Sequence, residues 1–333
     1  MDKIIVTGGL GFIGSNFVRR VFQSRKNIQL VNVDYMGQGS NLSNLVFLSK
    51  NPRYKFVKGD TANSGLWRKI IKDARFIVNF AAETHVDRSI SNPDKFLRSN
   101  VIGTFTLLEE CRKARIEKIV HISTDEVYGS IEYGSFTEKS PLNPSSPYSA
   151  TKAAADVLAR AWCATYELPV VTFRCTNNFG PFQYPEKFIP KAIIRALRGM
   201  PITLYGGGRQ IRDWIYVEDF CAAIERGLEK GVPGEIYNIS AGNELTNREM
   251  AEKVLRELGK PVNMITNTKD RPGHDYRYSL SSNKARRDLS WKPARMIGEA
   301  LSLTVKWYLE NRKWWAPLAS SKVLSARPWE KRW

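Results

Sequence analysis

Two acidic residues stand side by side at the expected end of a buried strand. Asp125 and Glu126 follow Ser123 and Thr124 in the stretch "KIVHISTDEVYGS". Adjacent carboxylates in a partly desolvated place repel each other, so their pKa values are expected to separate. One acid that keeps its proton beside one that loses it suits general acid–base chemistry at neutral pH. A helix-capping cluster is the alternative for these residues taken alone.

A second reactive pair lies in "PYSATKAAAD", residues 147–156. Tyr148 and Lys152 have helical i, i+4 spacing, so on a helix both can point into one cleft. The ammonium is expected to favour the phenolate and to lower the pKa of Tyr148, which would make it a base toward a hydroxyl. A buried Tyr beside a surface Lys is the alternative for this motif alone. Its place at a helix start after the fifth expected strand favours the catalytic interpretation.

A glycine-rich turn, "VTGGLGFIGSN", connects the first expected strand to a helix. Gly8, Gly11 and Gly14 let the backbone turn tightly and approach a pyrophosphate at the helix N-terminus. Asp34 ends the second expected strand, where an acid can bind both ribose hydroxyls and repel a 2′-phosphate. The pattern predicts NAD as the cofactor, in preference to NADP. A glycine-rich turn with a surface Asp is the alternative.

Two further strand ends agree with a dinucleotide site. Asp60 ends the third expected strand, where it could face the adenine, although a helix N-cap is nearly as good an explanation. The stretch "NFAAETH" ends the fourth with small residues that would let a cofactor lie close.

Short β-branched runs alternate with helical patterns over the first half of the chain. The expected strands are 3–7, 28–33, 54–58, 76–80, 118–123 and 170–175, and the expected helices are 13–22, 66–73, 96–114 and 150–166. Such alternation predicts an α/β fold, a Rossmann-like doubly wound parallel sheet, with a smaller C-terminal α/β substrate-binding domain. We expect the NAD-binding domain over 1–176 with contributions from about 210–240, the nucleotide-sugar domain over 177–313, and a tail of unknown role over 314–333.

Composition narrows the class of protein. The 333 residues carry a net charge of +18, but the basic residues are dispersed, which fits a phosphate-bearing substrate better than nucleic acid as the main partner. No apolar run is long enough to span a membrane, and the chain begins directly in a strand-like run without leader features. Three scattered histidines make a metal site improbable. We therefore expect a cytoplasmic protein with no metal, nucleic-acid or membrane partner.

These motifs together resemble the extended short-chain dehydrogenase/reductase family. Within it, the chain is most similar to the dTDP-glucose 4,6-dehydratases. The stretches that carry this resemblance are "FAAETHVDRSI", "STDEVYGS", "NNFGPFQYPEKFIP", "QIRDWIYVEDF" and "RPGHDYRY". The resemblance implies that dTDP-glucose becomes a 4-keto-6-deoxy sugar nucleotide plus water, with tightly bound NAD regenerated in each cycle, and that the enzyme is a homodimer.

The resemblance also implies roles for individual residues. Tyr148 would take the C4 hydroxyl proton, Glu126 the C5 proton, and Asp125 would protonate the departing C6 hydroxyl. Thr124 would bond the C4 oxygen and Lys152 the nicotinamide ribose. The implied cofactor-binding residues are Gly8, Gly11, Phe12, Ile13, Gly14, Asp34, Asp60, Thr61, Ala81, Ala82, Thr84, Ser99, Tyr148, Lys152 and Asn177. The implied substrate-binding residues are Thr84, Thr124, Asn178, Glu186, Lys187, Arg212, Asn247, His274 and Tyr278.

Two segments depart from the family pattern, and other functions remain open. After Asp34 the usual sequence is roughly "KLTYAGNL", whereas this chain has "YMGQGSNL"; the tail 314–333, with four tryptophans, has no trusted counterpart. The tail is a dimer contact, a docking strip or a disordered end.

A related epimerase or decarboxylase is the enzymatic alternative, although an epimerase has no use for paired acids and the decarboxylases tend to carry Ser-Glu at these two positions. A non-catalytic NAD-binding module with a basic docking surface is the alternative of another class.

Overall fold

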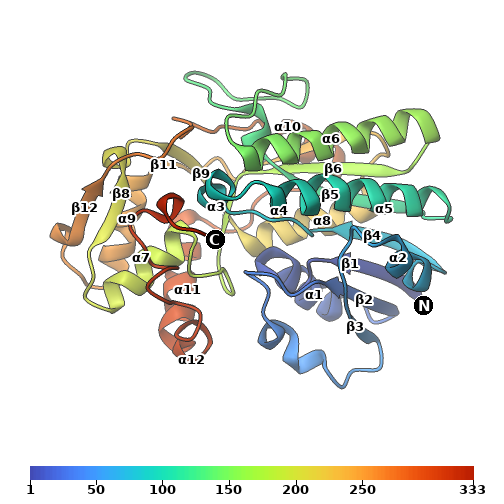
Figure 1. The fold of residues 1–333 in the computed structure, drawn as a ribbon, viewed down its shortest axis with the longest axis horizontal. Helices are drawn as coiled ribbons and strands as arrows, with labels where there is room; N and C mark the ends of the chain where they lie inside the picture. The colour runs from blue at the N-terminus through green and yellow to red at the C-terminus, as the bar shows by residue number, and fades with distance from the viewer.

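A seven-stranded parallel sheet forms the centre of the computed structural model, which describes residues 1–333 (Figure 1). Its strands are β1 (Asp2–Thr7), β2 (Ile28–Asp34), β3 (Tyr54–Lys58), β4 (Ala74–Asn79), β5 (Lys118–Thr124), β6 (Val170–Cys175) and β10 (Ile236–Ile239), in the order β10-β6-β5-β4-β1-β2-β3. Most of these strands are apolar runs because both faces of a parallel sheet are covered by helices. All six expected strands are present, and the expected fold class is confirmed.

Helices cover both faces of this sheet. The helices of one face are α1 (Phe12–Ser24), α8 (Val217–Lys230) and α10 (Asn283–Leu289), and those of the other are α2 (Ser64–Ile70), α5 (Gly103–Arg112) and α6 (Pro147–Tyr166). Phe17 and Phe220 are fully buried in the first core, and Trp67 and Leu107 in the second. Residues 217–239 thus return to the sheet as α8 and β10 after the chain has left it.

One expected helix is interrupted where it reaches the edge of the sheet. Instead of a single helix over 96–114, the chain forms α4 (Asp94–Phe96), a π-helical turn η2 (Leu97–Ile102) and α5. A π turn widens the helix by one residue and is frequent at functional sites. Here the widened turn contains Ser99, one of the predicted cofactor-binding residues.

A second group of elements packs beside the sheet around its own core. It contains β7 (Asn177–Phe179), β8 (Ile202–Tyr205), β9 (Ile211–Tyr216), β11 (Glu244–Thr246), β12 (Ile265–Thr268), α7 (Phe188–Leu197), α9 (Asn247–Glu257), α11 (Ile297–Glu310) and α12 (Arg312–Trp315). The strands form two small sheets, β11-β9-β7 and β12-β8. Ile193, Trp214, Val254 and Leu301 are at the centre of this second core. The short helix α3 (Val86–Ser91) follows β4, close to the place where the two groups meet.

The tail over 314–333 folds back onto the second core. Trp315, Ala319, Val323 and Leu324 are all buried there. A short turn, η6 (Pro328–Glu330), then contacts α3, and the C-terminus lies in the middle of the view in Figure 1. The tail is therefore an integral part of the fold.

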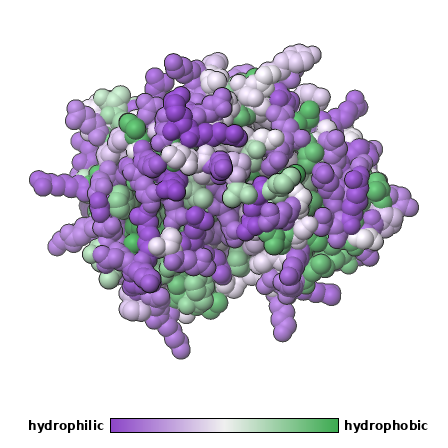
Figure 2. Space-filling view, turned by 180° about the vertical axis from the view of Figure 1, so that it is seen from behind, coloured by the Kyte–Doolittle hydropathy of each residue, from purple (hydrophilic) through white to green (hydrophobic).

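The outer surface agrees with the high net charge. The face shown in Figure 2 is mostly hydrophilic, with hydrophobic residues scattered over it. None of the helices has the combination of length and apolar character that crossing a membrane requires.

Candidate active site

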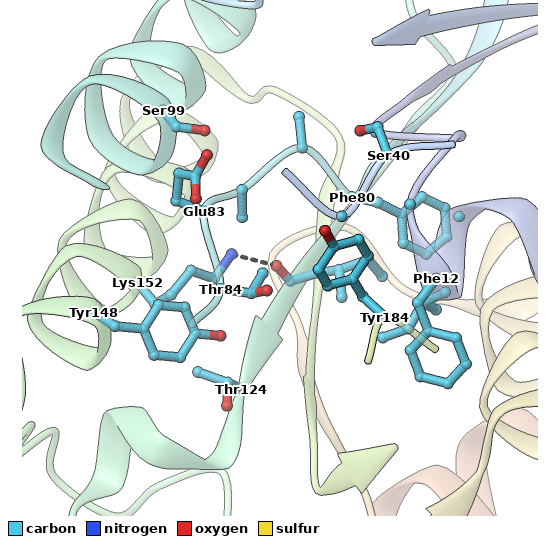
Figure 3. Close-up of a pocket in the computed structure, with 18 of the residues that line it drawn as sticks. Phe12, Ser40, Phe80, Glu83, Thr84, Ser99, Thr124, Tyr148, Lys152 and Tyr184 are labelled. Atoms are coloured by element: carbon cyan, nitrogen blue, oxygen red, sulfur yellow. Dashed lines mark hydrogen bonds between the residues drawn. The ribbon is translucent and has the colours of Figure 1, made fainter. Parts of the chain in front are cut away.

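The carboxyl ends of the parallel strands converge on two adjoining cavities, as the geometry of doubly wound sheets dictates. The first has a volume of about 460 Å³ and the second about 170 Å³. Five residues line both cavities and mark the junction: Thr84, Glu126, Asn177, Glu186 and Lys187. Figure 3 shows the first cavity between Tyr148, Lys152 and Thr124 on one side and Phe12, Ser40 and Phe80 on the other.

The structure brings the predicted site residues together around these cavities. The first cavity is lined by Gly8, Gly11, Phe12, Ile13, Gly14, Asp34, Asp60, Thr61, Ala81, Ala82, Thr84, Ser99, Thr124, Asp125, Glu126, Tyr148, Lys152, Asn177, Asn178, Glu186 and Lys187. The second adds Arg212, Asn247, His274 and Tyr278. Their individual roles stay predictions.

The glycine turn after β1 leaves no room for larger side chains. Gly8 has a φ of +67°, and a Cβ there would lie 2.8 Å from the Ala81 nitrogen. A Cβ on Gly14 would lie 2.4 Å from the Gly8 carbonyl oxygen. Gly11 caps α1 without a side-chain hydrogen bond, so first-turn N–H groups remain free for an anion. This cradle fits the pyrophosphate of a dinucleotide.

Asp34 at the end of β2 is held by its own loop. Its Oδ2 accepts a hydrogen bond from the Leu10 nitrogen at 3.1 Å, and its Oδ1 accepts from the Met36 nitrogen and from Ser40 Oγ, both at 2.8 Å. Burial raises the pKa of this carboxyl, and these donors oppose the shift. The fixed carboxylate lines the first cavity, where a ribose of the dinucleotide fits.

Thr124 and the acid pair form the turn that follows β5. Thr124 Oγ1 accepts a hydrogen bond from the Glu126 nitrogen at 3.3 Å and lies 3.1 Å from Asp125 Oδ1, to which it can donate. Asp125 is 3 % exposed, and its Oδ2 has no hydrogen-bond partner. Burial raises the pKa of Asp125 well above its usual value, and the charge of Glu126 adds to this effect. Both effects favour the protonated form of Asp125, which is the form that can donate a proton.

Glu126 lies among cations. Burial raises the pKa of its carboxyl, but Arg271, Arg212 and Lys187 oppose the shift by favouring the charged form. Burial raises the pKa of both acids, but the opposing cations differ: Arg212 acts on both carboxyls, whereas Arg271 and Lys187 act on Glu126. This asymmetry is the one that an acid–base pair requires.

Helix α6 positions Tyr148 and Lys152 from a well-defined start. Ser146 and Ser149 form a capping box, and Pro147 occupies the first turn. Lys152 Nζ donates to the Ile122 carbonyl oxygen at 2.6 Å, which ties α6 to β5. Both side chains are buried and line the first cavity.

The expected lowering of the Tyr148 pKa is wrong for this structure. Burial raises the pKa of the phenol well above its usual value, and the negative charge of Glu126 adds to the rise. Burial also lowers the pKa of Lys152, whose ammonium is directed to a backbone carbonyl. Desolvation of the phenolate therefore outweighs the attraction expected from helical spacing.

Arg212 is a buried cation with no carboxylate partner. Its guanidinium donates to the Ile211 carbonyl oxygen at 2.7 Å and to the Asp275 carbonyl oxygen at 2.9 Å, and it lies 4.2 Å from the centre of the Tyr278 ring. The nearby Asp213 binds Ser240 and backbone amides instead. An unpaired guanidinium in a cavity is suited to an anionic ligand such as a diphosphate.

Sequence reasoning missed a buried ion network beside the junction. Arg88 forms salt bridges with Glu83 at 3.2 Å and with Glu186 at 3.0 Å. The Tyr35 hydroxyl, from the loop that departs from the family pattern, donates to Glu83. Glu83 and Arg88 both lie in "FAAETHVDRSI", so this motif could have indicated them. Their association with Tyr35 is visible only in the tertiary structure.

Arg271 is a second site residue that the sequence did not predict. Its Nη1 lies 2.9 Å from Asp87 Oδ1, it lines the second cavity, and its charge gives the largest effect opposing the rise in the Glu126 pKa. The stretch "RPGHDYRY" had already indicated that this loop belongs to the site. A basic residue beside a Pro-Gly turn was the sequence feature that could have identified Arg271. Burial and Arg271 lower the pKa of His274 in the same loop, whereas Asp270, 2.6 Å from its Nδ1, opposes the shift.

A sequence model of the GDP-mannose 4,6-dehydratase family matches residues 5–304, most of the chain. The chain belongs to this family. It is 44 % identical over 330 residues to the dTDP-glucose 4,6-dehydratase of Streptomyces niveus, covering 98 % of each chain. The dTDP-glucose 4,6-dehydratase of Streptomyces venezuelae, solved with NAD bound, superposes with a TM-score of 0.94 at 44 % identity, covering 95 % of this chain and 100 % of the other.

These relatives confirm the resemblance that the motifs indicated. The fold by itself is shared more widely: the UDP-glucose 4-epimerase of Thermotoga maritima has a TM-score of 0.86 at 27 % identity, over 93 % of this chain and 99 % of the other. Dehydratase and epimerase must therefore be told apart by their sites.

Burial of the Asp125 carboxyl should make the free energy of unfolding depend on pH. Because the folded state holds the Asp125 proton more tightly than the unfolded state, stability contributed by this group is lost as pH rises above the usual carboxyl pKa of 3.8. Asp125→Asn should raise Tm at neutral pH by about 2–4 °C and have a smaller effect below the usual carboxyl pKa. Thermal denaturation of wild type and Asp125→Asn at neutral pH and below the usual carboxyl pKa measures this difference in Tm.

Glu132→Gln is the matched control, because it makes the same change from acid to amide at an exposed carboxyl. It should leave Tm unchanged at both pH values. An Asp125→Asn variant that is destabilised equally at both would contradict the assignment of a burial cost to this carboxyl.

Proposed function

We propose that this chain converts dTDP-glucose into dTDP-4-keto-6-deoxyglucose and water, with NAD as a bound cofactor. The observation that carries the proposal is the acid pair, Asp125 and Glu126, at the place where the two cavities meet. The relatives support the same substrate and cofactor, since proteins of this name match over nearly the whole chain and one is solved with NAD bound.

The first cavity fits NAD through its own residues. The glycine turn and the α1 N-terminus would hold the pyrophosphate, Asp34 a ribose, and Lys152 the nicotinamide ribose. When bound, NAD supplies a positively charged ring that favours the Tyr148 phenolate, accepts the C4 hydrogen as hydride and returns it to C6. The raised pKa of Tyr148 makes this charge necessary, because the protein alone keeps the phenol protonated.

The second cavity fits the nucleotide sugar. Lys187 and Arg212, which donate to backbone carbonyls, would bind the diphosphate. Asn178, Glu186, Asn247, His274 and Tyr278 complete the predicted contacts. With the diphosphate there, the sugar reaches the junction, where Thr84 and Glu126 line both cavities. The hexose ring then lies beside Tyr148, Thr124 and the acid pair.

Proton transfers at this junction give the reaction. Tyr148 takes the proton of the C4 hydroxyl, while Thr124 hydrogen-bonds the C4 oxygen. The resulting C4 ketone acidifies the C5 proton, which Glu126 removes as general base. Asp125 donates its proton to the C6 hydroxyl, which leaves as water. The elimination needs a base and an acid at once, and Glu126 and Asp125 supply one of each. Glu126 then returns a proton to C5 as hydride is returned to C6, and Tyr148 and Asp125 recover their starting protonation by exchange with solvent.

Isotope tracing tests the proposed reaction. With dTDP-glucose deuterated at C4, the product should carry the label at C6, because the hydrogen is removed and returned inside one active site. Mass spectrometry should also show one solvent hydrogen at C5 and no net consumption of NAD. UDP-glucose, CDP-glucose and GDP-mannose in parallel assays report the nucleotide preference, and each should turn over at least about tenfold less efficiently.

The epimerase alternative predicts a different outcome. In that case the label stays at C4, water is not lost, and the product is an isomer of the substrate. A product without loss of water, or no product from any of the nucleotide sugars, would refute the dehydratase proposal.

We also propose that the enzyme is a homodimer. Large apolar side chains are exposed on the helical segments η2, α5 and α6: Leu97, Ile102, Phe105, Val157 and Tyr166. A cluster of this kind is typical of a protein interface. The protein should sediment as a dimer, and Val157→Glu should shift it toward monomer.

Val232→Glu is the control for the dimer, because Val232 is similarly exposed, at 51 % against 56 % for Val157, but lies after α8. It should leave the dimer intact. A wild-type monomer, or equal effects of both substitutions, would contradict the interface.

A cytoplasmic location is proposed as well, supported by four cysteines without a disulfide. Recovery of the protein in a membrane or secreted fraction would contradict it.

A further inference from the structure

The last nine residues, "SARPWEKRW", lie against the second cavity. We refer to 325–333 as the terminal strap. Ser325 and Ala326 line the second cavity directly, and neither lines the first. The strap then turns through η6 and contacts α3, whose first residues also line that cavity. A segment with no assigned role therefore forms part of the wall around the expected substrate.

Two arginines, buried Arg195 and exposed Arg198, fix the path by which the strap reaches the cavity. Arg195 of α7 donates from Nη1 to the Leu324 carbonyl oxygen at 2.6 Å, and from Nε to the Pro201 carbonyl oxygen at 2.6 Å. Arg198 donates to the Ala319 carbonyl oxygen at 2.8 Å. Arg195 is 8 % exposed and has no carboxylate partner, so these carbonyls satisfy its buried donors. The strap is thus anchored immediately before it begins.

Trp329 packs on a residue that lines the cavity. Its ring meets that of Tyr205 edge-on, with centres 4.7 Å apart and an angle of 84°. The Tyr205 hydroxyl donates to Asp87 Oδ2 at 3.1 Å, and Asp87 also binds Arg271. One tryptophan of the strap therefore supports a chain of contacts, Tyr205–Asp87–Arg271, whose members all line the second cavity.

Trp333 packs on α3 from the other side. Its ring centre lies 6.4 Å from that of His85 and 5.7 Å from the Arg88 guanidinium carbon. Asn92 Nδ2 donates to the Trp333 carbonyl oxygen at 3.4 Å, and Trp333 Nε1 donates to the Pro328 carbonyl oxygen at 2.8 Å. The two tryptophans hold the strap, Tyr205 and α3 together as one wall.

The position of this wall relative to the junction indicates which part of the substrate it serves. The sugar must lie at the junction, because the acid pair and Tyr148 are there. The strap lines only the second cavity, on the side not shared with the first. An extended nucleotide sugar whose hexose occupies the junction directs its nucleotide half into the unshared part.

We propose that the terminal strap forms one wall of the nucleotide subsite, with Trp329 and Trp333 as positioning residues that hold Tyr205 and α3 in place. The inference rests on the proposed function for the identity of the nucleotide sugar. The strap acts through packing, so its exposed cations Lys331 and Arg332 are not required. Its loss weakens binding of the nucleotide half without changing the chemical step or the retention of NAD.

Steady-state kinetics and calorimetry on full-length variants test the strap. Trp329→Ala and Trp333→Ala should each raise KM for dTDP-glucose, and the combined variant by about tenfold or more, with kcat changed by less than about twofold. The Kd for dTDP should rise in parallel, and bound NAD after gel filtration should equal that of wild type. Lys331→Ala with Arg332→Ala is the control and should leave KM and Kd unchanged.

A chain ending at Leu324 supplies the complete deletion and should behave like the double tryptophan variant. Unchanged KM and Kd in the tryptophan variants would overturn the proposal, as would a fall in kcat or loss of NAD at constant KM. An equal rise in KM from the Lys331/Arg332 control would assign the effect to charge and also overturn it. If wild type binds dTDP but does not turn over dTDP-glucose, the proposed function fails while the calorimetry still decides the role of the strap.

Discussion

Charge burial at the carboxyl edge of the parallel sheet is the constraint on which the rest of the structure depends. A buried charge must be paired, hydrogen-bonded or neutralised by a shifted pKa. Below the site Arg174 binds Asp156 at 2.8 Å, and Asp156 lies 3.6 Å from His121. At the junction Arg88 is shared between two glutamates. At Asp125 burial raises the pKa well above its usual value and so favours the neutral form.

This distribution connects stability to catalysis. The paired groups give the site a fixed frame, since the Arg88–Glu186 pair joins α3 to the segment that follows β7. Two groups of the site are incompletely satisfied: Asp125 Oδ2 has no partner, and Arg212 donates to backbone carbonyls without a carboxylate partner. Both are costs to the free protein that a bound nucleotide sugar can relieve. The terminal strap belongs to the frame, because its tryptophans hold α3, from which Arg88 and Asp87 project.

Much of the fold and the site could be predicted from the sequence because the signals were local. Strand and helix boundaries followed from β-branched runs and helical spacing, and the glycine turn and Tyr148–Lys152 motif needed only neighbouring residues. The π turn at Ser99 was not predictable, since a helical pattern does not reveal one extra residue in a turn. The Tyr35–Glu83 contact was missed because it joins loops after different strands.

The sign of the Tyr148 pKa shift shows why local spacing is insufficient for electrostatics. Helical spacing identified a nearby cation, but the pKa depends on burial and on every charge that faces the phenol. The sequence of the tail likewise did not reveal its role. Trp329 packs on Tyr205 and Trp333 packs on α3, and neither contact leaves a pattern in the tail's own sequence. Such residues are predictable only once the elements that they join have been placed.

The central claim is that the acid pair turns a sugar oxidation into an elimination. The most direct test is Asp125→Asn combined with Glu126→Gln, given dTDP-glucose under single-turnover conditions with enzyme in excess. Mass spectrometry of the quenched sugar should then show a 4-keto hexose that retains its C6 hydroxyl, with no 6-deoxy product. Formation of the 6-deoxy product at the wild-type rate would contradict the account.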